Sequence, residues 1–308
     1  MQDGSTIIVR YAVYLVLAAL FGLSAFSLYG LQKHERGSAL VLRPWLSGFA
    51  LAGLVVSAFA MLLMVSVMAG TPIWPVDSTA VAALVVGGPI GSAWVVRMIA
   101  LAVAGAAAIF AGERTGSLLV AMTASAVAMG TLAWTGHGAM DEGSLGWFHL
   151  AADIVHLLAA GVWIGALFGL LLLLARPASR VDTAHLELTH RALHGFGAIG
   201  TVVVATIVVT GLVNSWLLVG PSNVPSMMAD LYGRLLVIKV ALFVGMLALA
   251  ALNRFRLTPA FERSIATADH NGALGALRRS LGIEAGLVVV IMGLVAWLGT
   301  LAPPASGM

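Results

Sequence analysis

The sequence has 308 residues, of which 60% are hydrophobic and 9% are charged, and its mean hydropathy is +1.02. A soluble chain of this length needs a polar surface, so the composition excludes a soluble globular protein. The net charge is +3, but most of the basic residues lie in short loops, and we expect no nucleic-acid partner. Cysteine is absent, which excludes disulfides and thiolate metal binding and leaves His, Met, Asp and Glu as candidate ligands.

Apolar runs long enough to cross a bilayer, about twenty residues each, follow one another along the chain. We expect membrane-spanning helices at residues 7–30, 46–69, 92–111, 118–135, 148–175, 197–219, 232–252 and 281–301. The stretch 71–89 has only a short apolar run and is predicted to be a loop or a re-entrant piece. The first run is too long for the apolar core of a signal peptide, so we expect it to be retained. The predicted fold is an all-α polytopic bundle of about eight helices, a single transmembrane domain over residues 1–308.

The lysines and arginines of the loops orient this bundle. The loops after the first, third, fifth and seventh runs hold three, one, three and five basic residues, which is 12 of the 16 in the chain. Loops with an excess of positive charge stay on the cytoplasmic side of the membrane. We therefore expect a multi-pass protein of the bacterial inner membrane with both termini in the periplasm.

Ionisable side chains lie near the start of the fifth run. His149, Asp153 and His156 fall within roughly 60° of one another on a helix, so they share one face. Such groups are costly inside a membrane and by default indicate a functional site. Two imidazoles and a carboxylate favour a transition-metal site or an ion pathway. The alternative is a structural polar cluster in which Asp153 pairs with Lys239 or Arg97.

Another face of the fifth run carries small residues. Gly161, Gly165 and Gly169 form a row roughly 120–200° around the helix from His149. A row of this kind lets a second helix approach closely. We therefore expect this helix to have a packing face and a polar face.

Further candidate ligands surround the predicted outer end of the same helix. His137 and Met140 lie in the preceding outer loop, and His137 is the best candidate for a fourth ligand. Met61, Met64 and Met68 share one face of the second run. Thioethers select Cu(I), but methionine is also an ordinary apolar filler, so packing is the favoured interpretation of this stripe taken alone.

Other polar positions receive structural interpretations. Asn214 in the sixth run is expected to form a hydrogen bond between helices. His190 and His194 are four residues apart and could share a metal ion, although a solvated amphipathic connector is favoured. Glu284 is expected near the inner interface, without a special role.

Several motifs are similar to those of the CopD/PcoD copper resistance family. The resemblance rests on the stretch 153–165 and on the segments 210–214, 232–239 and 251–259, and it is clearest over residues 135–260. Its motif positions include Asp153, His156, Gly161, Trp163, Gly165, Asn214 and Lys239.

The resemblance implies an inner-membrane protein of copper homeostasis and resistance that moves copper ions from the periplasm toward the cytoplasm. We expect no enzymatic activity. Copper, as Cu(I) or Cu(II), would be its ligand, and its partner besides the lipid bilayer would be a separate periplasmic copper-binding protein of the CopC type. Copper caught by His137, Met140 and the outer methionines would then pass to the polar face of the fifth helix.

Two other functions stay open at this point. The intramembrane histidines could be axial ligands of a b-type haem in an electron-transfer or haem-linked oxidoreductase protein, although no facing helix offers an obvious histidine. The chain could also be a non-transporting membrane anchor or sensor that presents copper to a periplasmic partner.

Overall fold

The computed structural model describes residues 2–111, 114–136, 143–176, 182–225, 227–266 and 271–304, and within these ranges it contains helices and no strand. Eight helical segments are long and apolar enough to cross a membrane, which confirms the predicted all-α bundle. Their helices are α1 (Gln2–Tyr29), α3 (Leu42–Ala69), α5 (Pro89–Ala106), α6 (Thr115–Gly130), α7 (Gly143–Leu174), α8 (Thr183–Val219), α9 (Leu231–Leu252) and α11 (Asn271–Leu298).

Short elements fill the connections. They are α2 (Arg36–Ala39), α4 (Ser78–Val86), α10 (Thr258–Ala266), the 3₁₀ turns η2 (Thr131–Thr135) and η5 (Pro221–Asn223), and the π-helical turns η1 (Ala107–Ala111) and η6 (Asn253–Leu257). The stretch 71–89 thus contains a helix that the sequence did not predict. Asp77 begins it by accepting the backbone N–H groups of Thr79 and Ala80, each at 3.0 Å. Its 9 residues are too few to cross the bilayer.

Two spanning helices begin well before their apolar runs. α8 starts at Thr183 and α11 at Asn271, whereas the hydropathy pattern predicts starts at 197 and 281. The side chain of Asp182 caps α8 by accepting the N–H of His185 at 2.8 Å. The polar residues that precede each of these apolar runs therefore continue the same helix, which the hydropathy pattern did not predict.

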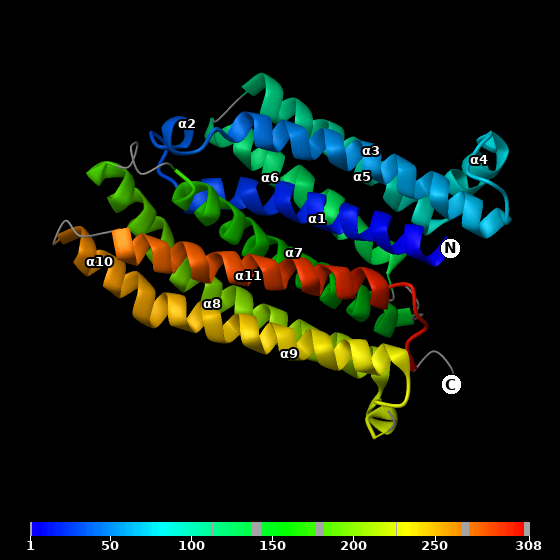
Figure 1. Ribbon diagram of the computed structural model, residues 1–308. Coiled ribbons are helices and arrows are strands. Elements are labelled where there is room, and N and C mark those ends of the chain that lie inside the picture. Colours follow the sequence, from blue (N-terminus) through cyan, green and yellow to red (C-terminus); the bar gives the residue numbers. More distant parts are fainter. Residues whose placement is uncertain are drawn as a thin grey trace.

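Helices α1 and α7 form the centre of the bundle (Figure 1). α3, α5 and α6 lie on one side of this pair, and α8, α9 and α11 lie on the other. Leu17, Leu20 and Phe26 of α1 are fully buried between the two groups. The start of α1 and the end of α11 lie at the same end of the bundle.

The basic loops meet at the opposite end. Arg191 pairs with Glu35, and Arg36 donates a hydrogen bond of 2.8 Å to Thr115 Oγ1. Arg278 donates a hydrogen bond of 2.7 Å to a carbonyl in the last turn of α7. These contacts join the connections after the first, third, fifth and seventh spans, so the positively charged loops share one end of the bundle.

The glycine row of α7 faces α1. A Cβ atom at Gly165 would lie 1.9 Å from the carbonyl carbon of Gly22, and one at Gly169 would lie 2.3 Å from the ring of Phe26. The two backbones are therefore in direct contact, as the small-residue spacing predicts. Because this contact fixes the rotation of α7 about its axis, the polar face of α7 points toward α8, α9 and α11.

Candidate functional site

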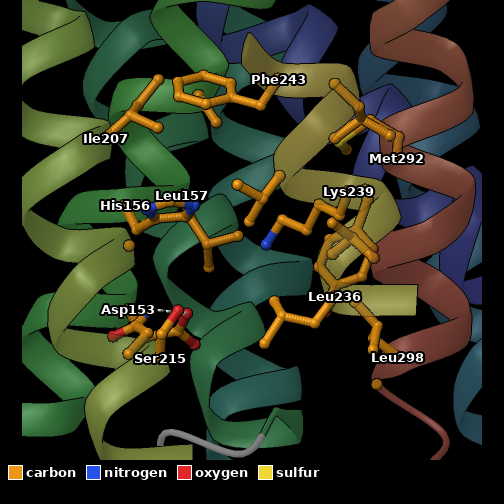
Figure 2. A pocket seen from close by; sticks show the side chains of 18 of the residues that line it. Asp153, His156, Leu157, Ile207, Ser215, Leu236, Lys239, Phe243, Met292 and Leu298 are labelled. Carbon is orange, nitrogen blue, oxygen red and sulfur yellow. Dashed lines mark hydrogen bonds between the residues drawn. The ribbon is translucent and has the colours of Figure 1, made fainter. Parts of the chain in front are cut away.

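A cavity of about 450 Å³ lies among α7, α8, α9 and α11 (Figure 2). Most of its wall is apolar, with Ile207, Phe243 and Met292 among the lining residues. It is not sealed between α8 and α9, where the lining residues Leu212 and Val244 remain 67% and 58% exposed. In such an apolar chamber the few polar side chains decide which ligand is bound.

The polar face of α7 supplies three of these groups. His149, Asp153 and His156 all line the cavity, so the face they share on the helix opens into one chamber. His149 is only 1% exposed, and Asp153 accepts a hydrogen bond of 3.3 Å from Asn214 Nδ2. Within the described ranges no three His, Asp or Glu side chains form a group that could hold one metal ion. His149, Asp153 and His156 are thus successive positions along α7 and do not form one closed metal site.

The hydrogen bonds of His156 determine which of its ring nitrogens can bind a metal. Its Nδ1 atom lies 2.9 Å from Thr210 Oγ1, and this hydroxyl oxygen lies 2.6 Å from the carbonyl oxygen of Thr206. A hydroxyl has one hydrogen, and that of Thr210 is donated to the carbonyl of Thr206. Nδ1 therefore donates its proton to Thr210, and the neutral ring keeps the lone pair on Nε2, the form that binds a metal ion.

A lysine faces this row from the other side of the chamber. Lys239 of α9 extends into the cavity opposite α7 (Figure 2), and no described carboxylate lies within ion-pairing distance of it. Arg97 instead donates to Thr131, at 2.8 Å to Oγ1 and 3.2 Å to the carbonyl oxygen. Of the two cations considered for Asp153, only Lys239 therefore shares its chamber, and the two do not touch.

The methionine stripe lies elsewhere. Met61, Met64 and Met68 line a second cavity of about 170 Å³, bordered by α1, α3 and α5. Arg10 and Arg97 line the same cavity. Helix α1 separates this stripe from the α7 residues, and Arg10 borders both cavities.

His137 and Met140 lie outside the described residues. The described chain before them ends at Gly136, which lines the first cavity. A Cβ atom at Gly136 would lie 3.5 Å from Asp153 Oδ2. The loop that carries His137 and Met140 therefore begins beside Asp153.

The surroundings of one buried carboxyl group were not predicted from the sequence. Glu284 is only 1% exposed, and its two oxygens accept hydrogen bonds from Trp163 Nε1 at 3.0 Å and from Asn253 Nδ2 at 2.9 Å. The sequence did not predict that neighbouring helices enclose this group. The sequence did contain an indication of a functional role, because Glu284, like Asp153, is an ionisable residue within a predicted membrane-spanning run.

The histidines of the chamber bear on the haem alternative. Among the described residues that line it, the only histidines are His149 and His156, and both belong to α7. An axial pair of imidazoles binds haem from opposite sides, which a single straight helix does not provide. The geometry of the described chamber therefore does not favour a bis-histidine haem.

Comparison with known proteins gives a consistent result. Residues 1–147 match the family model described as copper resistance protein D-like, N-terminal domain, and residues 190–298 match that of copper resistance protein D. The chain is 44% identical to copper resistance protein D of Pseudomonas syringae pv. tomato over 98% of both chains, and 24% identical to inner membrane protein YebZ of Escherichia coli strain K12 over 81% of both. It is 32% identical to copper transport protein CutJ of Bacillus subtilis strain 168 over 41% of this chain and 22% of that protein. No solved structure matches. The chain belongs to the copper resistance protein D family.

Proposed function

We propose that this protein conducts copper ions across the bacterial inner membrane, from the periplasm toward the cytoplasm, and that it is not an enzyme. Its family makes it a membrane protein of copper homeostasis. The names of two relatives, an inner membrane protein and a copper transport protein, support the location and the transport role.

The observation that carries the proposal is the polar row of α7 inside a chamber of the membrane domain. From His149 to His156 the helix rises about 10 Å, roughly a third of the thickness of the hydrocarbon core. A copper ion can pass along this row in steps of one helical turn. Neutral imidazoles bind either oxidation state of copper, and the carboxylate of Asp153 offsets the positive charge of the ion.

The orientation in the membrane is inferred from the positions of the basic loops, and the direction of transport is the one that the family resemblance implies. Loops rich in Lys and Arg stay in the cytoplasm, so the opposite end of the bundle, with the start of α7, faces the periplasm. In this orientation both termini are periplasmic. The loop carrying His137 and Met140 would take copper from a separate periplasmic copper-binding protein of the CopC type. Met61, Met64 and Met68 stay predicted ligands, and the two arginines in their cavity disfavour a cation there.

Removing both imidazoles tests this proposal. We expect His149→Ala/His156→Ala to lose copper from the purified protein and to abolish copper accumulation in cells, at an unchanged protein level. His194→Ala is the matched control, because His194 is exposed and lies near the basic end of α8. The measurements are the metal content and visible spectrum of the detergent-purified proteins and the copper content of the cytoplasm.

Three outcomes would contradict the proposal in different ways. Copper accumulation by the double variant equal to that of the wild type would exclude the α7 row as the pathway. Copper bound by the wild type without any rise in cytoplasmic copper would instead support a membrane anchor or sensor. A Soret band without copper would support the haem protein.

A further inference from the structure

Glu284 and its neighbours form a second polar cluster, and Glu284 lies outside the cavity that His149, Asp153 and His156 line; these three residues of α7 are called the copper row below. The two groups that donate to its carboxyl oxygens, Trp163 Nε1 and Asn253 Nδ2, are both uncharged. α11 packs against α1, α7, α9, η6 and α10, and no described charged or titratable group on these elements acts on Glu284. Arg254 is bound to Thr201, and Arg278 is bound to backbone carbonyls.

A buried carboxylate without a counter-charge is costly in the low-dielectric interior of a membrane protein. Removing one partner of a buried ion pair is strongly destabilising, because a single charge is left uncompensated. Glu284 stands in that position if it is ionised. Its charge must therefore be neutralised, and a proton on the carboxyl group is the simplest means.

The cluster also has unused hydrogen-bonding capacity. Asn253 Oδ1 and Ser280 Oγ are buried atoms without a partner among the described residues, and the two residues are only 7% and 6% exposed. Ser280 lies one turn before Glu284 on α11, so their side chains share a face. Asn253 is the first residue of the π-helical turn η6, and such turns occur frequently at functional sites.

The ligand class follows from these atoms. The side-chain groups of the cluster that can take up a cation are a carboxyl, an amide oxygen and a hydroxyl. Hard oxygen donors suit a proton better than Cu(I), which prefers thioether and imidazole ligands. The cluster is therefore chemically distinct from the copper row of α7.

We propose that Glu284 is a proton-binding site coupled to the copper row: it holds a proton while the row is empty and releases it when a copper ion reaches His156. This inference rests on the proposed function. In the release step the O–H bond of the carboxyl group breaks, its electron pair stays on the oxygen, and water accepts the proton. When copper leaves, Glu284 takes up a proton again.

The coupling is electrostatic. Trp163 binds Glu284 and follows His156 by seven residues, about 10 Å along the same helix. A unit positive charge on the order of 10 Å away weakens the hold of a carboxyl group on its proton on the order of tenfold at the effective dielectric constant of a protein, so we expect a partial release. The effect needs no conformational change, because it acts through space between His156 of α7 and Glu284 of α11, which is hydrogen-bonded to α7 through Trp163.

Infrared difference spectroscopy of the detergent-purified full chain tests both parts of the inference. Without copper, we expect the wild type to show the C=O stretch of a protonated carboxylic acid that is missing in Glu284→Gln. Addition of Cu(I) should lower the intensity of this band, raise that of a carboxylate and release protons to a pH indicator, while Glu284→Gln binds copper without that release. Glu187→Gln, at an exposed position of α8, should behave as the wild type, and Glu284→Asp should keep part of the release.

The outcomes separate this inference from the proposed function. Absence of the acid band from the copper-free wild type would overturn the proton site, whatever the protein does with copper. A band of unchanged intensity while copper is bound would overturn the coupling. If neither the wild type nor any of the variants binds copper, the proposed function is refuted and the coupling with it. The presence or absence of the acid band would then decide the proton site.

Discussion

The contact between α1 and α7 is tight enough for a sharp prediction about one methyl group. Gly165→Ala would place a Cβ atom 1.9 Å from the carbonyl carbon of Gly22 and 2.1 Å from its Cα. Ordinary contact begins at 3.4 Å, so α1 would have to withdraw by the difference, about 1.5 Å. Overpacking typically costs about 1–3 kcal/mol, and backbone atoms cannot rotate away as a side chain can. We therefore expect the free energy of unfolding to fall by about 3 kcal/mol.

Thermal unfolding in detergent measures this loss, with the fluorescence of the 8 tryptophans as the signal. We expect Gly165→Ala to unfold several degrees below the wild type. Gly245→Ala on α9 is the matched control, because nothing lies within 4 Å of a Cβ atom built there, and its Tm should stay close to that of the wild type. A Gly165→Ala protein with the Tm and copper content of the wild type would refute the close α1–α7 contact.

Three further substitutions test the chamber through the copper affinity of the purified protein. Thr210→Val removes the acceptor that orients His156, and loss of such a partner should weaken copper binding about 10–100-fold, whereas Thr206→Val should change it little. Asp153→Asn keeps the shape of the side chain but removes its negative charge, so copper should bind more weakly and uptake should slow. Lys239→Met removes the cation that faces Asp153 across the chamber, so copper should bind more tightly than in the wild type, and unchanged binding would show that the lysine does not act on the ion.

The features that the sequence predicted correctly depend on short-range periodicity. A bilayer leaves backbone groups no partner but their own chain, so apolar runs of sufficient length form spanning helices. The row of Gly161, Gly165 and Gly169 likewise requires a close neighbour, whichever helix provides it. The shared face of His149 and His156 follows from helical geometry alone.

The remaining features depend on how helices rotate and pair, which hydropathy does not encode. The sequence placed the methionines of α3 near the same end of the bundle as the polar row of α7, but α1 lies between the two groups. The hydrogen bonds of Glu284 were likewise not predictable, because they come from Trp163 of α7 and from Asn253 at the end of α9. Such positions are set by packing against other helices, whose residues can be more than a hundred positions away in the sequence.

The position of Arg10 bears on whether a cation could move between the two cavities. Its guanidinium group borders both cavities and donates a hydrogen bond of 2.9 Å to the carbonyl of Thr135, at the start of the loop that carries His137. A cation that left the methionine cavity for the α7 row would have to pass this fixed positive charge, which repels it. The fixed positive charge of Arg10 therefore disfavours the passage of a cation between the two cavities, so the methionines of α3 and the polar row of α7 are separate candidate sites.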